Sequence, residues 1–115
     1  MTNAEKLTLA KHACHIRMGV IEGTHSAKCG HPGGSLDIAE LLSYLYFVDM
    51  NVDPKDPHAP DRDRLVLSKG HAAPALYAAL AERRAMPQAA DTPCPRLPVD
   101  ISTPGTLFML GWPCR

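Results

Sequence analysis

The stretch that decides the fold is Arg64-Leu65-Val66-Leu67-Ser68-Lys69-Gly70-His71-Ala72-Ala73-Pro74-Ala75-Leu76-Tyr77. The apolar run at 65–67 is typical of a short buried strand, and Pro74 followed by apolar residues predicts the first turn of a helix running to about Arg84. Ligands of open α/β sheets bind beyond the carboxyl ends of the strands, where the N–H groups of a following helix can hold a phosphate. We therefore expect His71 at the rim of a binding site.

Length and charge restrict the classes of protein that this chain could be. A chain of 115 residues forms one small domain, and its 12 Lys and Arg residues balance its 12 Asp and Glu residues. This balance gives no basic face for nucleic acid, and no run of 18 apolar residues predicts a membrane span. The N-terminus lacks the apolar core of a signal peptide, and the four cysteines are widely spaced, so we expect reduced thiols in a cytoplasmic protein.

One group of residues near the N-terminus could suggest a metal site. Cys14 lies beside His12 and His15, but a zinc motif needs paired ligands at short spacing at both ends. The sequence contains no CxxC pair. We therefore predict no metal binding through the cysteines.

The first predicted element is an amphipathic helix over residues 4–22. Thr2 and Glu5 form a capping-box pattern before it, and Gly23 is expected to end it. A loop at 24–34 follows and contains Gly30-His31-Pro32-Gly33-Gly34, where glycines allow close approach of a bound group and Pro32 stiffens the turn. His31 is the candidate functional residue of this loop. His25 lacks the glycine setting and is expected to be an ordinary solvated side chain.

A second helix is predicted from Ser35, as its cap, to Tyr46. Its apolar face is broad, which indicates packing between layers or against another subunit. A polar loop at 50–64 should follow, with Asp61-Arg62-Asp63-Arg64 as a solvated, mutually paired turn. Six of the 11 prolines fall in residues 87–115, so we divide the chain into a folded part at 1–86 and a proline-rich, poorly ordered tail.

The chain resembles the N-terminal, thiamine diphosphate-binding part of transketolase, most of all the N-terminal subunit of split forms. The resemblance covers about residues 4–86 and rests on two Gly-His motifs with an Asp-Arg-Asp-Arg run between them. The motif segments are Gly30-His31-Pro32-Gly33-Gly34-Ser35-Leu36, Met50-Asn51-Val52-Asp53-Pro54 and Asp61 to Tyr77. The E1 component of pyruvate dehydrogenase and deoxyxylulose-phosphate synthase share the ancestral pattern, but Ser68-Lys69-Gly70-His71-Ala72-Ala73-Pro74 fits transketolase better.

This resemblance implies an α/β fold, namely part of a doubly wound parallel sheet, mostly helical as it stands, with one or two strands. It implies transfer of a two-carbon ketol unit between sugar phosphates with thiamine diphosphate and Mg²⁺ as cofactors. By motif position, His31 would contact the substrate and move a proton at the developing oxyanion. His71, with Gly70, would lie between cofactor and substrate. The family forms homodimers or pairs with a companion C-terminal subunit.

The sequence departs from the family pattern in ways that affect the expected function. Cys29 stands where the family usually has Ser, Asn or Gly, and neither a third Gly-His segment nor a Gly-Asp-Gly motif occurs. Without that aspartate the sequence offers no oxygen ligand at the expected place for Mg²⁺ on the diphosphate. We therefore expect a truncated form that is inactive alone. The alternative is a non-catalytic remnant that docks on an intact partner through the face at 36–46.

Overall fold

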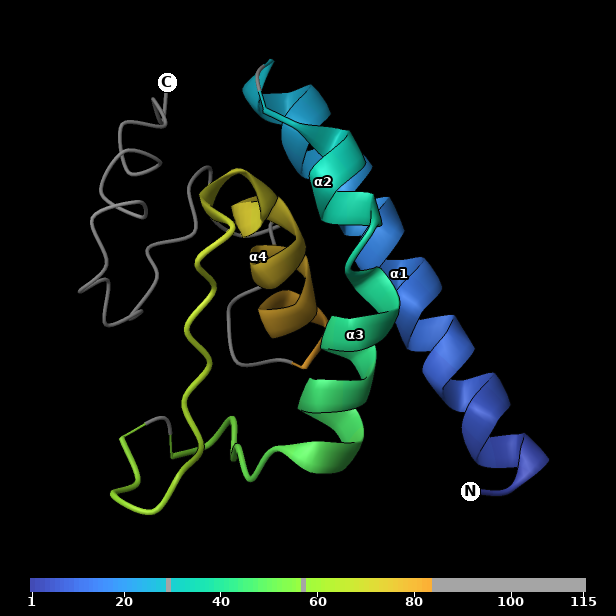
Figure 1. Ribbon diagram of the computed structural model, residues 1–115, viewed down its shortest axis with the longest axis vertical. Coiled ribbons are helices and arrows are strands. Elements are labelled where there is room, and N and C mark those ends of the chain that lie inside the picture. Colours follow the sequence, from blue (N-terminus) through green and yellow to red (C-terminus); the bar gives the residue numbers. More distant parts are fainter. Residues whose placement is uncertain (29, 57, 84–115) are drawn as a thin grey trace.

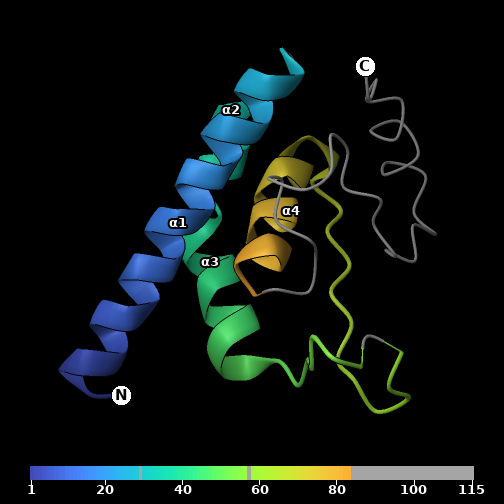
Figure 2. The same ribbon diagram turned by 180° about the vertical axis from the view of Figure 1, so that it is seen from behind.

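In the computed structural model the described part of the chain comprises residues 1–28, 30–56 and 58–83, and it is mostly helical. The elements are α1 (Asn3–Ala27), α2 (Pro32–Leu36), α3 (Ala39–Tyr44), the π-helix η1 (Leu45–Asp49), the 3₁₀ helix η2 (Gly70–Ala72) and α4 (Ala73–Glu82). Figures 1 and 2 show α1 as a long rod along one side, with α3 and α4 against its middle. The segment between η1 and η2 runs back along the side of α4 away from α1.

The core lies where α1, α3 and α4 meet. Ile16 and Val20 of α1 are fully buried and pack with side chains of α3, η1 and α4, namely Ala39, Leu42, Tyr46, Ala75 and Ala79. Small residues allow this close approach, because a Cβ added at Gly19 would lie 2.9 Å from Cβ of Ala78. The Ser43 hydroxyl donates to the carbonyl of Leu9 at 2.9 Å and ties α3 to α1.

Helix α1 begins as predicted but ends later. The capping box is confirmed: the Thr2 hydroxyl accepts from the Glu5 N–H at 3.2 Å, and the Glu5 carboxylate accepts from the Thr2 N–H. The predicted end at Gly23 is wrong, since the helix continues to Ala27 and is closed by Lys28 at φ 56°. A glycine costs a helix only about 1 kcal/mol, too little to end a long cooperative helix.

The predicted helix from Ser35 to Tyr46 is interrupted, which corrects the sequence analysis. Pro32 opens a short helix inside the expected loop, and the chain bends at 37–38 before α3 begins. Ser35 is not a cap: it lies inside α2, is fully buried, and its hydroxyl has no hydrogen-bond partner among the residues that the structure describes. Pro32 fixes a helical φ one turn earlier than the serine signal suggested.

The strand predicted at 65–67 is not formed, and the described residues contain no β-strand. Leu65 and Leu67 are half-buried while Val66 is 71% exposed, so the alternation of a strand is present without strand pairing. Ladder hydrogen bonds require a neighbouring strand, and none of the described segments supplies one. The mostly helical character is therefore confirmed, and the parallel sheet stays a prediction.

The loop that precedes that run is closed by hydrogen bonds between its two ends. Asp63 accepts from the N–H of Asn51 at 2.7 Å and donates its own N–H to the Asn51 carbonyl. The Asp63 carboxylate thus accepts from a backbone N–H. The described part of the chain shows no ion pair between the acidic and basic side chains of Asp61 to Arg64, which were predicted to pair with one another. Arg83 donates to the carbonyl of Val52 at 3.2 Å.

Helix α4 follows the prediction, with Pro74 in its first turn. No helix in the described ranges combines the length and apolarity that a bilayer crossing requires. The proline-rich tail assigned to 87–115 lies outside the described residues, as does Cys29.

Candidate functional site

His31 is presented by a bend between α1 and α2. Gly30 has a φ of 128°, a backbone conformation that favours glycine, and Pro32 begins α2 directly after the histidine. His31 itself is exposed. The glycine and the proline of the motif therefore each have a structural task, and together they place one imidazole at the start of a helix.

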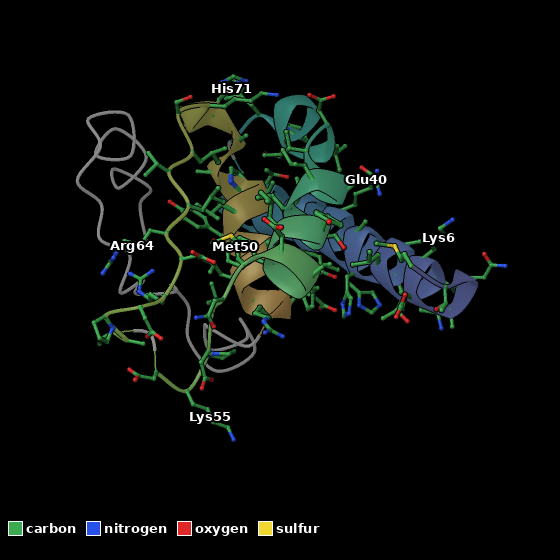
Figure 3. All side chains as sticks on the ribbon, turned by 60° about the horizontal axis from the view of Figure 1, so that its bottom comes forward. Lys6, Glu40, Met50, Lys55, Arg64 and His71 are labelled. Atoms are coloured by element: carbon green, nitrogen blue, oxygen red, sulfur yellow. The ribbon has the colours of Figure 1, made fainter. Side chains whose placement is uncertain are left out.

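His71 is presented by a second bend, formed by η2 between the extended segment and α4. The Ala72 N–H donates to the carbonyl of Lys69 at 2.9 Å and closes this turn. Ala72, Ala73 and Ala75 are buried beneath it, whereas His71 is exposed. Figure 3 shows His71 at the end of the molecule where α4 begins.

The fold brings the two histidines together from segments 40 positions apart in the sequence. Their ring centres are 6.0 Å apart and the planes are inclined by 86°, an edge-to-face arrangement. The predicted proximity of the two rings is therefore present, while the roles given to His31, His71 and Gly70 remain predictions. Two imidazoles at this distance could each exchange a hydrogen bond with one small polar ligand.

Gly34 makes this arrangement possible. A Cβ at Gly34 would lie 2.7 Å from Cδ2 and 2.8 Å from Nε2 of His71, and 3.3 Å from Cε of Lys69. These atoms rest against the backbone of α2, in a cradle that any side chain would fill. The second glycine of Gly33-Gly34 is thus needed by the His71 ring, while a Cβ at Gly33 would meet nothing within 4 Å.

A charged pair that the sequence did not single out lies beside the histidines. The Lys69 ammonium donates to the Asp37 carboxylate at 3.2 Å, linking η2 to the end of α2. The Asp37 side chain is 74% exposed, so solvent weakens this pair. Only the adjacency of Lys69 to the Gly-His motif could have suggested it from the sequence.

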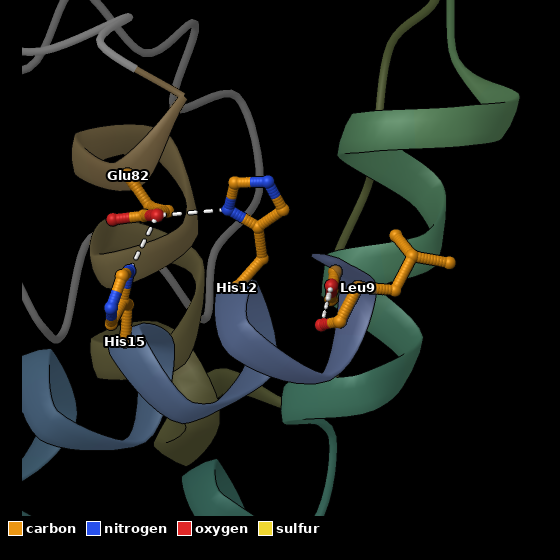
Figure 4. A network of polar contacts seen from close by, with 5 residues as sticks. Leu9, His12, His15 and Glu82 are labelled. Atoms are coloured by element: carbon orange, nitrogen blue, oxygen red, sulfur yellow. Dashed lines mark hydrogen bonds and ion pairs between the residues drawn. The ribbon is translucent and has the colours of Figure 1, made fainter. Parts of the chain in front are cut away.

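A second polar cluster lies at the opposite end of α4 (Figure 4). Nδ1 of His12 and Nδ1 of His15 both lie 2.9 Å from Oε1 of Glu82. Burial alone would raise the pKa of Glu82, but the hydrogen bonds and the charges of His15 and His12 together more than offset burial, so that pKa is lowered. Sequence analysis grouped these histidines with Cys14 and missed Glu82, because the acid is 67 positions away from the nearer histidine.

The two clusters differ in which cofactor they fit. The His71 ring itself occupies the cradle at Gly34, and the exposed rings of His31 and His71 could each hydrogen-bond a polar group of a substrate or cofactor. Mg²⁺ prefers oxygen ligands. Within the described ranges the one group of three or more potential metal ligands is His12, His15 and Glu82, which is rich in nitrogen. The described residues therefore offer no Mg²⁺ site at the histidine pair.

Comparison with known proteins places these features in a family. The profile described as "Transketolase, thiamine diphosphate binding domain" matches residues 9–82. The chain is 44% identical over 105 residues to the 6-deoxy-6-sulfo-D-fructose transketolase subunit SqwG of Clostridium sp. (strain MSTE9), an alignment that covers 90% of this chain and 35% of that protein.

Two further relatives support the same comparison. An apulose-4-phosphate transketolase subunit of Actinobacillus succinogenes is 39% identical over 111 residues, with 90% of this chain and 40% of that protein covered. The human transketolase is 43% identical over 79 residues, with 68% of this chain and 13% of that enzyme covered. The chain thus spans well under half the length of each of these relatives.

Proposed function

Because the chain belongs to the family of transketolase thiamine diphosphate-binding domains, we propose that it contributes to a ketol-transferring active site. Its contribution is the pair His31 and His71, called the two-histidine rim below. The reaction is transfer of a two-carbon ketol unit between sugar phosphates. When bound, thiamine diphosphate supplies the carbon nucleophile that adds to the donor carbonyl. The observation that supports this proposal most directly is the 6.0 Å separation of the His31 and His71 rings.

The residues of this chain would bind and orient the reacting groups and move protons. His31, exposed at the start of α2, would transfer a proton to the substrate carbonyl oxygen as negative charge develops there, and would take that proton back when the carbonyl re-forms. His71, which lies against Gly34, would position the cofactor relative to the substrate. An imidazole suits both duties, because it gains and loses a proton near neutral pH.

We propose that a companion chain completes the site. Two of the relatives are named as transketolase subunits, and this sequence contains no Gly-Asp-Gly motif to hold Mg²⁺ and the diphosphate. The companion would supply those ligands. Ketol transfer would then require both chains, and the 115-residue chain by itself would be inactive.

The test is to titrate two samples with thiamine diphosphate and Mg²⁺ and to measure binding by calorimetry. One sample is the chain alone, and the other is the chain mixed with a companion that carries Gly-Asp-Gly. The mixture should bind the cofactor saturably and transfer the ketol unit. His31→Asn and His71→Asn should each reduce the transfer by about 10²-fold or more, the usual contribution of a positioned acid or base. His58→Asn, an exposed loop histidine, is the matched control and should leave transfer unchanged. Transfer that survives both rim substitutions would contradict the proposal.

The second candidate is the non-catalytic fragment that docks on an intact partner. Leu41 and Tyr44 of α3 favour it, because they are 57% and 43% exposed while Leu42 between them is buried. Docking through this face predicts that Leu41→Glu abolishes capture of an intact transketolase chain, with retained folding checked by circular dichroism. Cofactor binding that depends on His31 and His71 would instead support the catalytic proposal.

A further inference from the structure

The cluster of His12, His15 and Glu82 lies away from the two-histidine rim and has no part in the function proposed above. It lies at the far end of α4 from His71, and a helix of this length spans roughly 15 Å. His12 and His15 are three positions apart and so project from one face of α1, while Glu82 ends α4. Figure 4 shows both rings directed at the one carboxylate.

The three side chains converge on one point. The two nitrogen to oxygen distances are each 2.9 Å, and the three ligand atoms all lie within 4.8 Å of one another. Ligands around a tetrahedral Zn²⁺ with bonds near 2 Å are roughly 3.3 Å apart. The contacts of His12 and His15 with Glu82 are each shorter than this, and small rotations of the three side chains would lengthen them to ligand spacings.

The cluster is also held in place before any ion binds. The His12 ring stacks on Phe47 with centroids 3.8 Å apart and planes within 10°. The Arg83 guanidinium lies 5.5 Å from the centre of the same Phe47 ring and is tied to the carbonyl of Val52. The cationic residue next to Glu82 is therefore engaged with an aromatic ring and a backbone carbonyl. The side chains of His12 and Glu82 are 25% and 22% exposed, which leaves an entry path for an ion.

We propose that His12, His15 and Glu82 form a binding site for a divalent transition metal ion of the Zn²⁺, Co²⁺ and Ni²⁺ class. Two imidazoles and one carboxylate suit these borderline ions, whereas Mg²⁺ and Ca²⁺ require oxygen ligands. Three protein ligands leave at least one position for water. The ion would replace the protons now shared between the imidazoles and the carboxylate, and it would join α1 to α4. Cys14, two positions from His12, projects about 200° around the helix and takes no part.

The experiment consists of two titrations of the 115-residue chain. Binding of Co²⁺ is measured by visible absorption, and binding of Zn²⁺ is measured by calorimetry. His15→Asn and Glu82→Gln are the test variants. His15 is 54% exposed and Gln keeps the shape of Glu, so both variants should fold, which circular dichroism checks. His25→Asn is the matched control, since His25 is an exposed histidine of the same helix outside the cluster. Each test variant should lower the affinity by about tenfold or more, and the control should not change it.

Two further readouts separate this site from the histidine rim. Zn²⁺ should shift the imidazole resonances of His12 and His15 and leave those of His31 and His71 in place, and it should raise the unfolding temperature of the unsubstituted chain but not of Glu82→Gln. The proposal is overturned by the absence of saturable binding. It is equally overturned by binding that persists in both test variants or that is removed by His31→Asn or His71→Asn.

Discussion

Replacing Gly34 by alanine tests whether the two-histidine rim depends on a bare backbone in α2. The added Cβ would lie 2.7 Å from Cδ2 of His71, whereas non-bonded carbon atoms prefer roughly 3.5–4.0 Å. The His71 ring must therefore retreat by about 1 Å. Because His71 is exposed, it can rotate away at little cost, so the damage should appear in the site and not in the fold.

The expected effect on stability is small because two contributions oppose each other. Alanine in place of glycine favours a helix by up to about 1 kcal/mol, and forcing His71 away from its preferred rotamer costs about 0.5–1.5 kcal/mol. The free energy of unfolding of Gly34→Ala should therefore stay within about 1 kcal/mol of the parent. The effect on ketol transfer with a companion chain should be far larger, since a 1 Å misplacement costs roughly 10²-fold.

Nuclear magnetic resonance measures the displacement directly. In the parent chain, protons of the His31 and His71 rings should give a nuclear Overhauser contact, because the ring centres are 6.0 Å apart in an edge-to-face arrangement. Gly33→Ala is the matched control, since its Cβ would meet nothing within 4 Å. The contact should persist in Gly33→Ala and weaken in Gly34→Ala. Identical His71 resonances in the parent and in Gly34→Ala would refute the reasoning.

Three other perturbations follow from the core. Gly19→Ala should destabilise the protein by about 1–3 kcal/mol in urea unfolding, because the new Cβ would lie 2.9 Å from the rigid Cβ of Ala78. Gly23→Ala should instead stabilise it by up to about 1 kcal/mol, since a Cβ there would have no described atom within 4 Å. Leu42→Ala should cost about 2–5 kcal/mol, since this side chain is 1% exposed, and a smaller loss measured by urea unfolding would mean that the core closes around the gap. Burial raises the pKa of Tyr46 to about 12 from its ordinary 10.0, so the folded state keeps the proton more strongly and stability should fall as pH rises from about 10 towards 12. Tyr46→Phe should flatten that part of a stability curve measured against pH, and an unchanged slope would contradict the assignment.

Local signals in the sequence determined the helices and the motifs. The capping box at Thr2, the proline in the first turn of α4 and the glycine-flanked histidines act over a few residues, so they can be read directly. Where two local signals competed, sequence reasoning failed. Gly23 did not stop α1, and Ser35 became a buried residue of α2 because Pro32 had already started that helix.

Only the tertiary structure decided which distant residues meet. The 6.0 Å separation of His31 and His71, the pairing of Lys69 with Asp37 and the convergence of two histidines on Glu82 all join segments at least 30 positions apart. No periodicity in a sequence encodes such distances, because they depend on how helices pack through side chains that interlock in three dimensions. The missing strand at 65–67 has the same cause, since a strand exists only when another segment lies beside it to accept and donate its hydrogen bonds.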